Sequence, residues 1–257
     1  MIHNVFVLSD FGSRDTYCGQ MKAALLGALG GEANLVDLTC CIPPGDIRGG
    51  AFDLMVSLPR LPRGSGVLAV VDPGVGTSRR AILAECGGCV TACPDNGLLS
   101  WVDTERAFSL PMPAHACSPT FHGRDIFAPA LARALSDRGW MESLEAVDPA
   151  TLVRFPKGSA SARGGVLDVP IARVDGFGNC ILWLTWEDLG GREPVALRNP
   201  RGSSFTLRPA DTYGPARPGL LLLEGSCGLL EVALSGGSAS FFTGLSEGDT
   251  VEVSFPG

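Results

Sequence analysis

The sequence predicts an α/β domain followed by a smaller, barrel-like all-β domain. In roughly the first 150 residues, short apolar runs alternate with stretches of helical periodicity, which is typical of βαβ units and a mainly parallel sheet. Later in the chain, short apolar runs follow one another with turn residues between them, as in small barrels. A small, polar, glycine-rich stretch separates the two patterns. We therefore expect domains at residues 1–150 and 165–257, joined by a linker at 151–164.

The elements of the first domain follow from its periodicity. Apolar runs that stop at polar residues predict strands, and apolar residues at helical spacing before Gly or Pro predict helices. A run interrupted by Gly87-Gly88 predicts a hairpin. The expected order is a strand ending at Asp10, a helix in 15–31, a strand at 34–38, a helix in 45–60, a strand at 66–72, the hairpin in 81–97, a short helix in 96–102 and a helix in 122–139 that starts near Arg124 or Asp125.

The second domain reads as a series of short strands separated by turns, with almost no helical pattern. The expected strands lie at 166–174, 180–186, 194–198, 204–208, 220–224, 229–234 and 250–255.

Composition excludes several classes of partner. The net charge of −7 and the pI near 5.0 disfavour a nucleic-acid partner. No apolar run reaches the length of a membrane span. The N-terminus lacks a basic, cleavable secretory pattern, so we expect a cytoplasmic protein that does not bind membranes. Its nine cysteines are then expected to be free thiols.

Two aspartates follow predicted strands of the first domain. Ligands of parallel α/β sheets bind outside the carboxyl ends of the strands, so Asp10 and Asp72 are candidates to line one crevice. Either residue could instead cap a loop or a helix. Asp72 and Arg79 could form a structural ion pair, or they could hold a water between carboxylate and guanidinium and favour its hydroxide character.

Other candidate motifs have simpler interpretations. His122 precedes a predicted helix, while His3 and His115 have no comparable setting, so we expect no three-histidine zinc site. Cys86-x-x-Cys89, with Cys93 nearby, could be a metal or redox motif, but a hairpin turn with packed thiols explains it as well. No dinucleotide-binding, Walker or serine-hydrolase motif is present in the sequence.

The second domain offers two polar turns. In the first, Asp175, Phe177 and Asn179 surround two glycines, either as a plain hairpin turn or as a carboxylate, an aromatic face and an amide for a purine ligand. The second turn spans residues 224–228.

Five motifs occur in one order along nearly the whole chain: SDFGSRDTYCGQMK, VVDPGVGTSRR, CPDNGLLS, FHGRDIFAPALA and VDGFGN. In this order they resemble the S-adenosyl-L-methionine (SAM) hydroxide adenosyltransferases, relatives of the SAM-dependent fluorinases and chlorinases. The resemblance implies the reaction of SAM with water to give adenosine and L-methionine, without a metal or another cofactor.

The resemblance also implies roles for individual residues. Asp72, Arg79 and His122 match the set that handles the water, and Asp10 matches the aspartate that binds the ribose diol. Further matches in the second domain are Asp175 and Ser226 for the methionine end, Asn179 for adenine, and Phe177 and Tyr213 as aromatic neighbours of adenine. The family pattern implies homotrimers whose sites are shared between subunits.

Two alternatives stay open at the level of sequence. A SAM-dependent halogenase is disfavoured because the extra fluorinase loop is absent, with only 13 residues between Arg80 and Pro94, and because halogenases replace the Asp72 and His122 equivalents. A non-catalytic SAM- or adenosine-binding protein is disfavoured only by the intact Asp-Arg-His set. Leu234 and Cys227 stand at positions where some halogenases have arginine.

Overall fold

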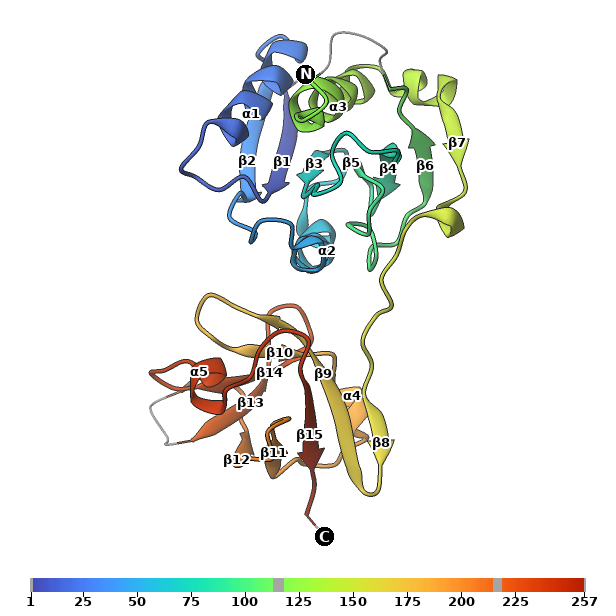
Figure 1. Ribbon diagram of the computed structural model, residues 1–257. Coiled ribbons are helices and arrows are strands. Elements are labelled where there is room, and N and C mark those ends of the chain that lie inside the picture. The colour runs from blue at the N-terminus through green and yellow to red at the C-terminus, as the bar shows by residue number, and fades with distance from the viewer. Residues whose placement is uncertain (1, 113–117, 215–218, 257) are drawn as a thin grey trace. The chain divides into compact units, whose positions relative to one another are not determined.

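A computed structural model describes residues 2–112, 118–214 and 219–256. His115 lies outside these residues. The chain forms two compact units, Met1–Pro156 and Lys157–Gly257, and each is considered by itself (Figure 1). The first is an α/β unit and the second is a β-barrel, so the fold class predicted from the sequence is confirmed.

The α/β unit is built on one sheet, which within the described residues has seven strands in the order β2-β1-β3-β5-β4-β6-β7. Strands β2, β1, β3 and β5 run parallel, and the other half of the sheet is antiparallel. The strands are β1 (His3–Ser9), β2 (Ala33–Thr39), β3 (Gly66–Val70), β4 (Ala81–Cys86), β5 (Cys89–Pro94), β6 (Arg106–Ser109) and β7 (Glu145–Val147). The helices are α1 (Tyr17–Ala28), α2 (Ile47–Ser57), η1 (Leu58–Arg60), a π-helical turn η2 (Gly123–Phe127), α3 (Ala128–Ser136), η3 (Arg138–Ser143) and η4 (Pro149–Thr151).

Both faces of this sheet are covered, because side chains alternate between the faces of a strand. Val5 and Val7 of β1 join the apolar core that contains residues of α1 and α3. Leu8, one residue further on, joins the core on the opposite face with Leu54 of α2. Helices α1 and α3 therefore pack on one face and α2 on the other (Figure 1).

The β unit closes on itself. Its strand order is β10-β14-β13-β12-β11-β15-β9-β8, and an additional pairing of β9 with β10 joins the ends of a seven-stranded barrel within the described residues. Leu182, Leu222, Val232 and Val251 are among the side chains that fill it. The elements are β8 (Ser161–Arg163), β9 (Val166–Val174), β10 (Cys180–Leu182), α4 (Trp186–Leu189), β11 (Ala196–Arg198), β12 (Ser204–Pro209), β13 (Leu220–Glu224), β14 (Leu230–Leu234), α5 (Ala239–Thr243) and β15 (Thr250–Ser254).

The structure differs from the sequence-based expectation in three places. Residues 96–102 form turns instead of a helix, where Ser100 Oγ donates to the Gly97 carbonyl oxygen. The expected linker contains the short strand β8, which pairs with β9. The strand expected over 180–186 ends at Leu182, because Thr185 begins α4 with a capping box.

The hairpin around Gly87-Gly88 is present between β4 and β5, and both glycines have positive φ. None of the helices in the described part of the chain is long and apolar enough to cross a membrane.

Candidate active site

The carboxyl ends of two neighbouring strands bring Asp10 and Asp72 to one edge of the sheet. Strands β1 and β3 are parallel, and Ser9 pairs with Val70. Asp10 directly follows β1, and Asp72 lies two residues beyond the end of β3. Both aspartates line one pocket of about 330 Å³. The crevice expected from the sequence thus exists at this edge.

Three charged or polar side chains form a connected group at this pocket. Arg79 Nε donates to Asp72 Oδ1 at 2.9 Å, and Arg79 Nη2 donates to Asp72 Oδ2. The same Nη2 lies 2.9 Å from Nδ1 of His122. The side chains of Asp72 and Arg79 are only 5% and 8% exposed, and His122 is buried as well. The structure therefore brings together the three residues that the family resemblance assigns to the water.

The contact with Arg79 fixes the tautomer of the His122 imidazole. A guanidinium has donors and no acceptor, so Nδ1 of His122 must accept, and a neutral imidazole then carries its proton on Nε2. Burial lowers the pKa of His122, and the positive charge of Arg79 lowers it further, while Asp72 and Asp125 act in the opposite direction. His122 is consequently neutral at neutral pH.

The loop between Asp72 and Arg79 contains a glycine at which any side chain would be strained. Gly76 has a φ of +79°, and a Cβ at this position would lie 2.6 Å from the Pro119 carbonyl oxygen. Thr77 Oγ1 donates to the carbonyl oxygen of Gly74 and closes the loop. The loop that carries Arg79 thus packs closely against the segment that leads to His122.

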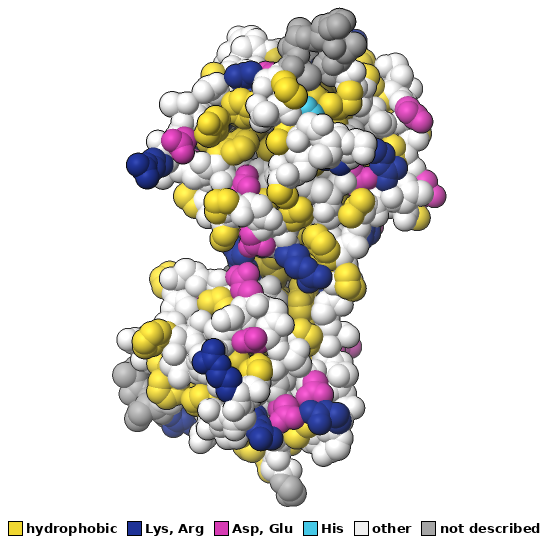
Figure 2. Space-filling view, in the orientation of Figure 1, with side chains coloured by type: hydrophobic (Ala, Val, Ile, Leu, Met, Phe, Trp, Pro, Cys, Tyr) yellow, Lys and Arg dark blue, Asp and Glu magenta, His cyan; other side chains and the backbone are white. Residues whose placement is uncertain are grey.

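The remaining pocket wall is largely aromatic. Phe11, Tyr17 and Phe121 line the pocket and contact one another, with ring centroids 5.6 to 6.0 Å apart. Asp10 accepts a hydrogen bond from the Gly45 amide through Oδ2. A carboxylate has a second oxygen, so Asp10 can still accept hydrogen bonds from a ligand. On the face of the α/β unit seen in Figure 2, hydrophobic side chains form several patches, with Lys, Arg, Asp and Glu side chains scattered among them.

In the β unit, three of the predicted binding residues share one turn, between β9 and β10. Asp175 Oδ1 accepts from the amides of Phe177 and Asn179, and Asn179 Nδ2 donates to Asp175 Oδ2 at 3.0 Å. Asn179 is buried, whereas Phe177 is 82% exposed. The turn therefore presents an aromatic ring to solvent beside a buried amide and a carboxylate.

Tyr213 has a partner that sequence reasoning missed. Its hydroxyl donates to the buried carboxylate of Glu231. Burial raises the pKa of Glu231, although the Tyr213 hydrogen bond acts in the opposite direction. Glu231 lies on the outer face of β14, because its neighbours Leu230 and Val232 fill the barrel, and a glutamate between two apolar residues of a strand was the available signal. Ser226 is exposed, in the turn that joins β13 to β14.

Cys86, Cys89 and Cys93 are buried in the hairpin β4–β5. Burial raises the pKa of Cys86 to about 12 and raises that of Cys93 well above its ordinary value. Among the described residues, these three thiols do not form a cluster that could hold a metal ion. Packed thiols in a hairpin therefore explain this motif.

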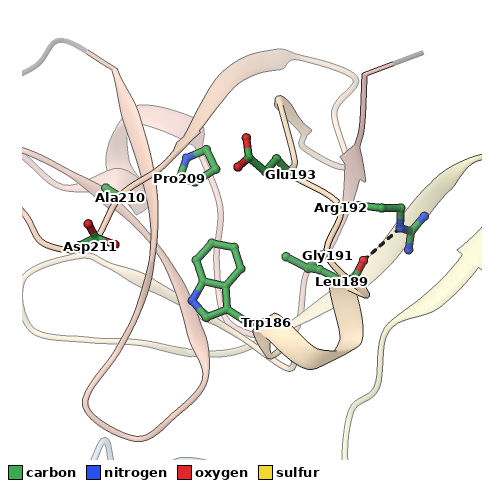
Figure 3. A pocket seen from close by; sticks show the side chains of 8 residues that line it. All are labelled: Trp186, Leu189, Gly191, Arg192, Glu193, Pro209, Ala210 and Asp211. Atoms are coloured by element: carbon green, nitrogen blue, oxygen red, sulfur yellow. Dashed lines mark hydrogen bonds between the residues drawn. The ribbon is translucent and has the colours of Figure 1, made fainter.

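A second pocket, of about 380 Å³, lies in the β unit. Figure 3 shows the Trp186 indole and the Glu193 and Asp211 carboxylates around it, with Arg192 Nε donating to the Leu189 carbonyl oxygen. None of the residues assigned by the resemblance lines this pocket. The connected acid, guanidinium and imidazole make the pocket of the α/β unit the candidate active site.

Fold and site together define a two-unit protein: an α/β unit with a buried Asp-Arg-His group at a sheet edge, followed by a β-barrel. Residues 5–145 match the SAM hydroxide adenosyltransferase N-terminal domain, and residues 169–252 match the C-terminal domain of the same family. The chain belongs to the SAM hydroxide adenosyltransferase family.

Similar proteins and structures extend over nearly the full length. The chain is 40% identical to an (R)-S-adenosyl-L-methionine hydrolase from Thermus thermophilus, over 97% of this chain and 98% of the relative. It is 37% identical to a protein of the same name from Salinispora arenicola, over 95% of each chain. A crystal structure of an uncharacterised conserved protein from Thermotoga maritima has a TM-score of 0.88 at 26% identity and covers 97% of this chain and 99% of its own.

Proposed function

We propose that this protein hydrolyses SAM to adenosine and L-methionine. The observation that carries the proposal is the guanidinium of Arg79, which binds Asp72 and His122 at the pocket that also contains Asp10. The names of the Thermus and Salinispora relatives support the substrate and the reaction.

The chemistry requires an oxygen nucleophile and little else. In SAM the sulfonium is already a good leaving group. A water oxygen attacks the 5′-carbon, the carbon–sulfur bond breaks, and its electron pair stays on the methionine sulfur. One proton is released from the water. A position in line with the carbon–sulfur bond and a pocket that excludes bulk water account for most of the required catalysis.

Asp72, Arg79 and His122 supply the water site in this proposal. Asp72 orients the water as an acceptor, and the positive charge of Arg79 favours its developing hydroxide character. Asp72 and His122 line the pocket, so Arg79 acts on the water through its charge and through its contacts with these two side chains. Neutral His122 fixes the orientation of the guanidinium through Nδ1.

The substrate contacts divide between the two units. We propose that Asp10 binds the ribose diol and that Phe11, Tyr17 and Phe121 form an apolar wall beside the sugar. Asn179, Phe177 and Tyr213 contact adenine, and Asp175 and Ser226 hold the amino-acid end of methionine. This assigns the water and ribose contacts to residues 1–150 and the other contacts to residues 165–257.

A homotrimer with shared sites completes the proposal. The family resemblance suggests this assembly, and the exposed aromatic rings of the β unit favour an interface. Phe177 is 82%, Phe241 is 91% and Phe242 is 54% exposed, and apolar rings with this exposure mark contact surfaces.

The direct test is product analysis of the purified protein with SAM, in the presence and absence of chloride. Adenosine and methionine in equal amounts are expected under both conditions, and Asp72→Asn and His122→Ala should abolish their formation. A haloadenosine would identify a halogenase instead, and binding without turnover would identify a binding protein. Turnover by Asp72→Asn within about threefold of the wild-type rate would exclude the assigned role of Asp72.

A further inference from the structure

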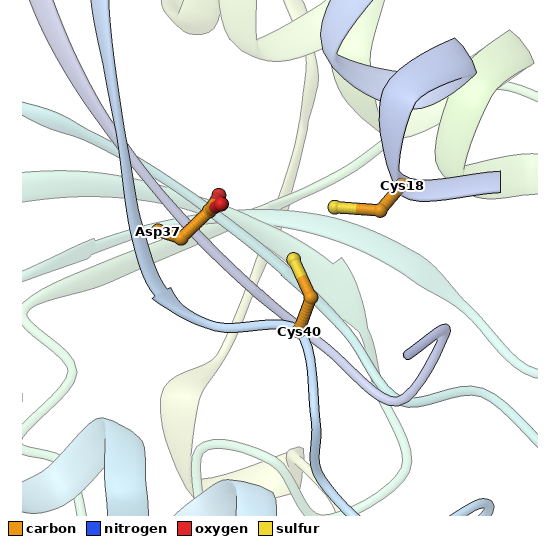
Figure 4. A group of neighbouring side chains, drawn as sticks. All are labelled: Cys18, Asp37 and Cys40. Carbon is orange, nitrogen blue, oxygen red and sulfur yellow. The ribbon is translucent and has the colours of Figure 1, made fainter. Parts of the chain in front are cut away.

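Two thiols and a carboxylate meet where the first turn of α1 lies against the end of β2. Cys18, Asp37 and Cys40 each place one ligand atom within 4.8 Å of the others. Figure 4 shows the three side chains pointing toward one another, Cys18 from α1 and the other two from β2 and the residue after it. Cys18 is 7% exposed, and Cys40 is partly buried.

An irregularity of β2 brings Asp37 and Cys40 to the same side. Residues three apart in a regular strand face opposite sides of a sheet. The pairing of β1 with β2 shifts register between Val7 and Leu8, whose partners are Asp37 and Thr39. The extra residue and the end of the strand at Thr39 turn Cys40 toward the helix.

Helix α1 directs a thiol and an ammonium group toward Asp37 and Cys40. Cys18 and Lys22 are four residues apart and lie on one side of α1. Lys22 Nζ donates to Asp37 Oδ2 at 2.7 Å. The ion pair therefore aligns the Asp37 carboxylate beside the two sulfur atoms and holds α1 against β2.

A buried hydroxyl beside the cluster supports a ligand there. Ser9 Oγ is fully buried. It lies next to the Cys40 thiol and hydrogen-bonds with it. A hydroxyl in this position can donate to a thiolate, and a metal-bound sulfur is a thiolate.

We propose that Cys18, Cys40 and Asp37 form a binding site for a thiophilic divalent cation of the zinc type, with water as the fourth ligand. Soft sulfur ligands select such cations over magnesium or calcium. In a tetrahedral site with bonds of about 2.0 to 2.3 Å, neighbouring ligand atoms lie roughly 3.5 to 3.8 Å apart. The ligand atoms of the cluster lie within 4.8 Å of one another, so they would approach by at most about 1.0 to 1.3 Å on binding.

The charges balance for a divalent ion. Binding forms two metal–sulfur bonds and releases the two thiol protons to solvent, so the ion's two positive charges meet two thiolates. Lys22 offsets the charge of Asp37. Asp37 is half exposed, which leaves the fourth position open to water.

The ion would join the first turn of α1 to the residues after β2. Both segments border the candidate active site: Tyr17 lines the pocket, and the Cys40 carbonyl oxygen accepts from Gly12, close to Asp10. The site stabilises this wall and takes no part in the reaction with SAM.

Cobalt titration of chelator-treated, reduced protein tests the proposal, because a cobalt–thiolate bond gives an ultraviolet charge-transfer band. We expect one cobalt per chain, displacement by zinc, and protection of two thiols from alkylation. Cys18→Ser and Cys40→Ser should each weaken binding at least tenfold. Asp37→Asn should weaken binding but keep the band, which separates ligand loss from misfolding. Cys227→Ser, a thiol in the other unit, is the matched control and should bind normally.

Absence of the band in the wild-type protein would overturn the proposal. Cobalt affinities of Cys18→Ser and Cys40→Ser equal to that of the wild type would do so as well. Loss of the band in Cys227→Ser would do the same. A Cys18–Cys40 disulfide that re-forms in air while the reduced protein binds no metal would show a thiol pair instead of a metal site.

Discussion

Arg79 binds two partners at once: its guanidinium pairs with Asp72 through Nε and Nη2, and Nη2 also lies 2.9 Å from His122 Nδ1. The three residues come from the loop after β3 and from the segment before η2. Because these contacts need Nε and both hydrogens of Nη2 in one fixed plane, a lysine at this position could not reproduce the arrangement.

Arg79→Lys is therefore expected to lose adenosine formation by on the order of 100-fold or more, although the charge is kept. Initial rates of adenosine release at saturating SAM measure the effect. Arg80→Lys is the matched control, since Arg80 pairs with Asp95 and Thr151 instead, and it should stay within about threefold of the wild-type rate. Equal losses in both variants would show that general packing, and not the Asp-Arg-His group, is disturbed.

The lowered pKa of His122 predicts a pH dependence of stability. Burial and Arg79 disfavour the protonated imidazole in the folded state, against the opposing charges of Asp72 and Asp125, while the unfolded chain titrates near 6.5. The unfolded state therefore binds the proton first, and stability is lost as pH falls from about 6.5 toward the lower folded-state pKa.

Thermal unfolding of the wild type and of His122→Asn between about pH 5 and 8 measures this effect. The melting temperature of the wild type should fall relative to that of the variant, which cannot titrate at this position, as pH drops below about 6.5. Hydrolysis by the wild type should decrease over the same range, because a protonated His122 cannot accept from Arg79. Parallel stability curves for the two proteins would contradict the assignment.

The glycines on either side of Phe177 provide a test of the turn that holds Asn179. Gly178 has a φ of +82°, and a Cβ there would lie 2.0 Å from Ser238 Oγ. A Cβ on Gly176 would meet nothing within 4 Å. Gly178→Ala is expected to lose about 1 to 3 kcal/mol of unfolding free energy in urea titration, and Gly176→Ala should lose well under 1 kcal/mol. Similar values for both would show that the turn does not hold Gly178 in this conformation.

Shared active sites predict complementation between inactive variants. Asp10→Ala removes the proposed ribose contact, and Asn179→Ala removes the proposed adenine contact. If the site is built from two subunits of a trimer, dissociation and reassembly of a mixture should restore part of the activity. A mixture that remains inactive, or an active monomer in sedimentation, would refute the shared site.

Much of the fold could be predicted because local patterns agree with the final structure. The strand ends at Asp10 and Asp72 follow from apolar runs that stop abruptly, and the hairpin follows from Gly87-Gly88. The turn at 96–102 was missed because its apolar residues are buried by long-range packing, as shown by Gly97, whose missing Cβ leaves room for the Phe155 ring. The start of α4 at Trp186, capped by Thr185, was missed as well, because a four-residue helix leaves little periodicity.

For the site, sequence patterns placed Asp10 and Asp72 at one sheet edge, but the grouping of Arg79 with His122 came from the family resemblance. These two residues are 43 positions apart, and no local pattern encodes such a contact. The same holds for Glu231 beside Tyr213 and for Cys18 beside Cys40, which meet only through tertiary packing. The register shift in β2 that turns Cys40 toward α1 leaves no signature in composition or spacing.

The proposed mechanism is a single displacement by water at the 5′-carbon of SAM. Its most direct test is the reaction in oxygen-18 water with SAM that is chirally labelled at this carbon. We predict one oxygen-18 in the 5′-hydroxyl of adenosine and inversion of configuration, since a single in-line attack inverts the carbon. Retention of configuration would indicate two displacements through a covalent adenosyl-enzyme and would contradict the proposed roles of Asp72, Arg79 and His122.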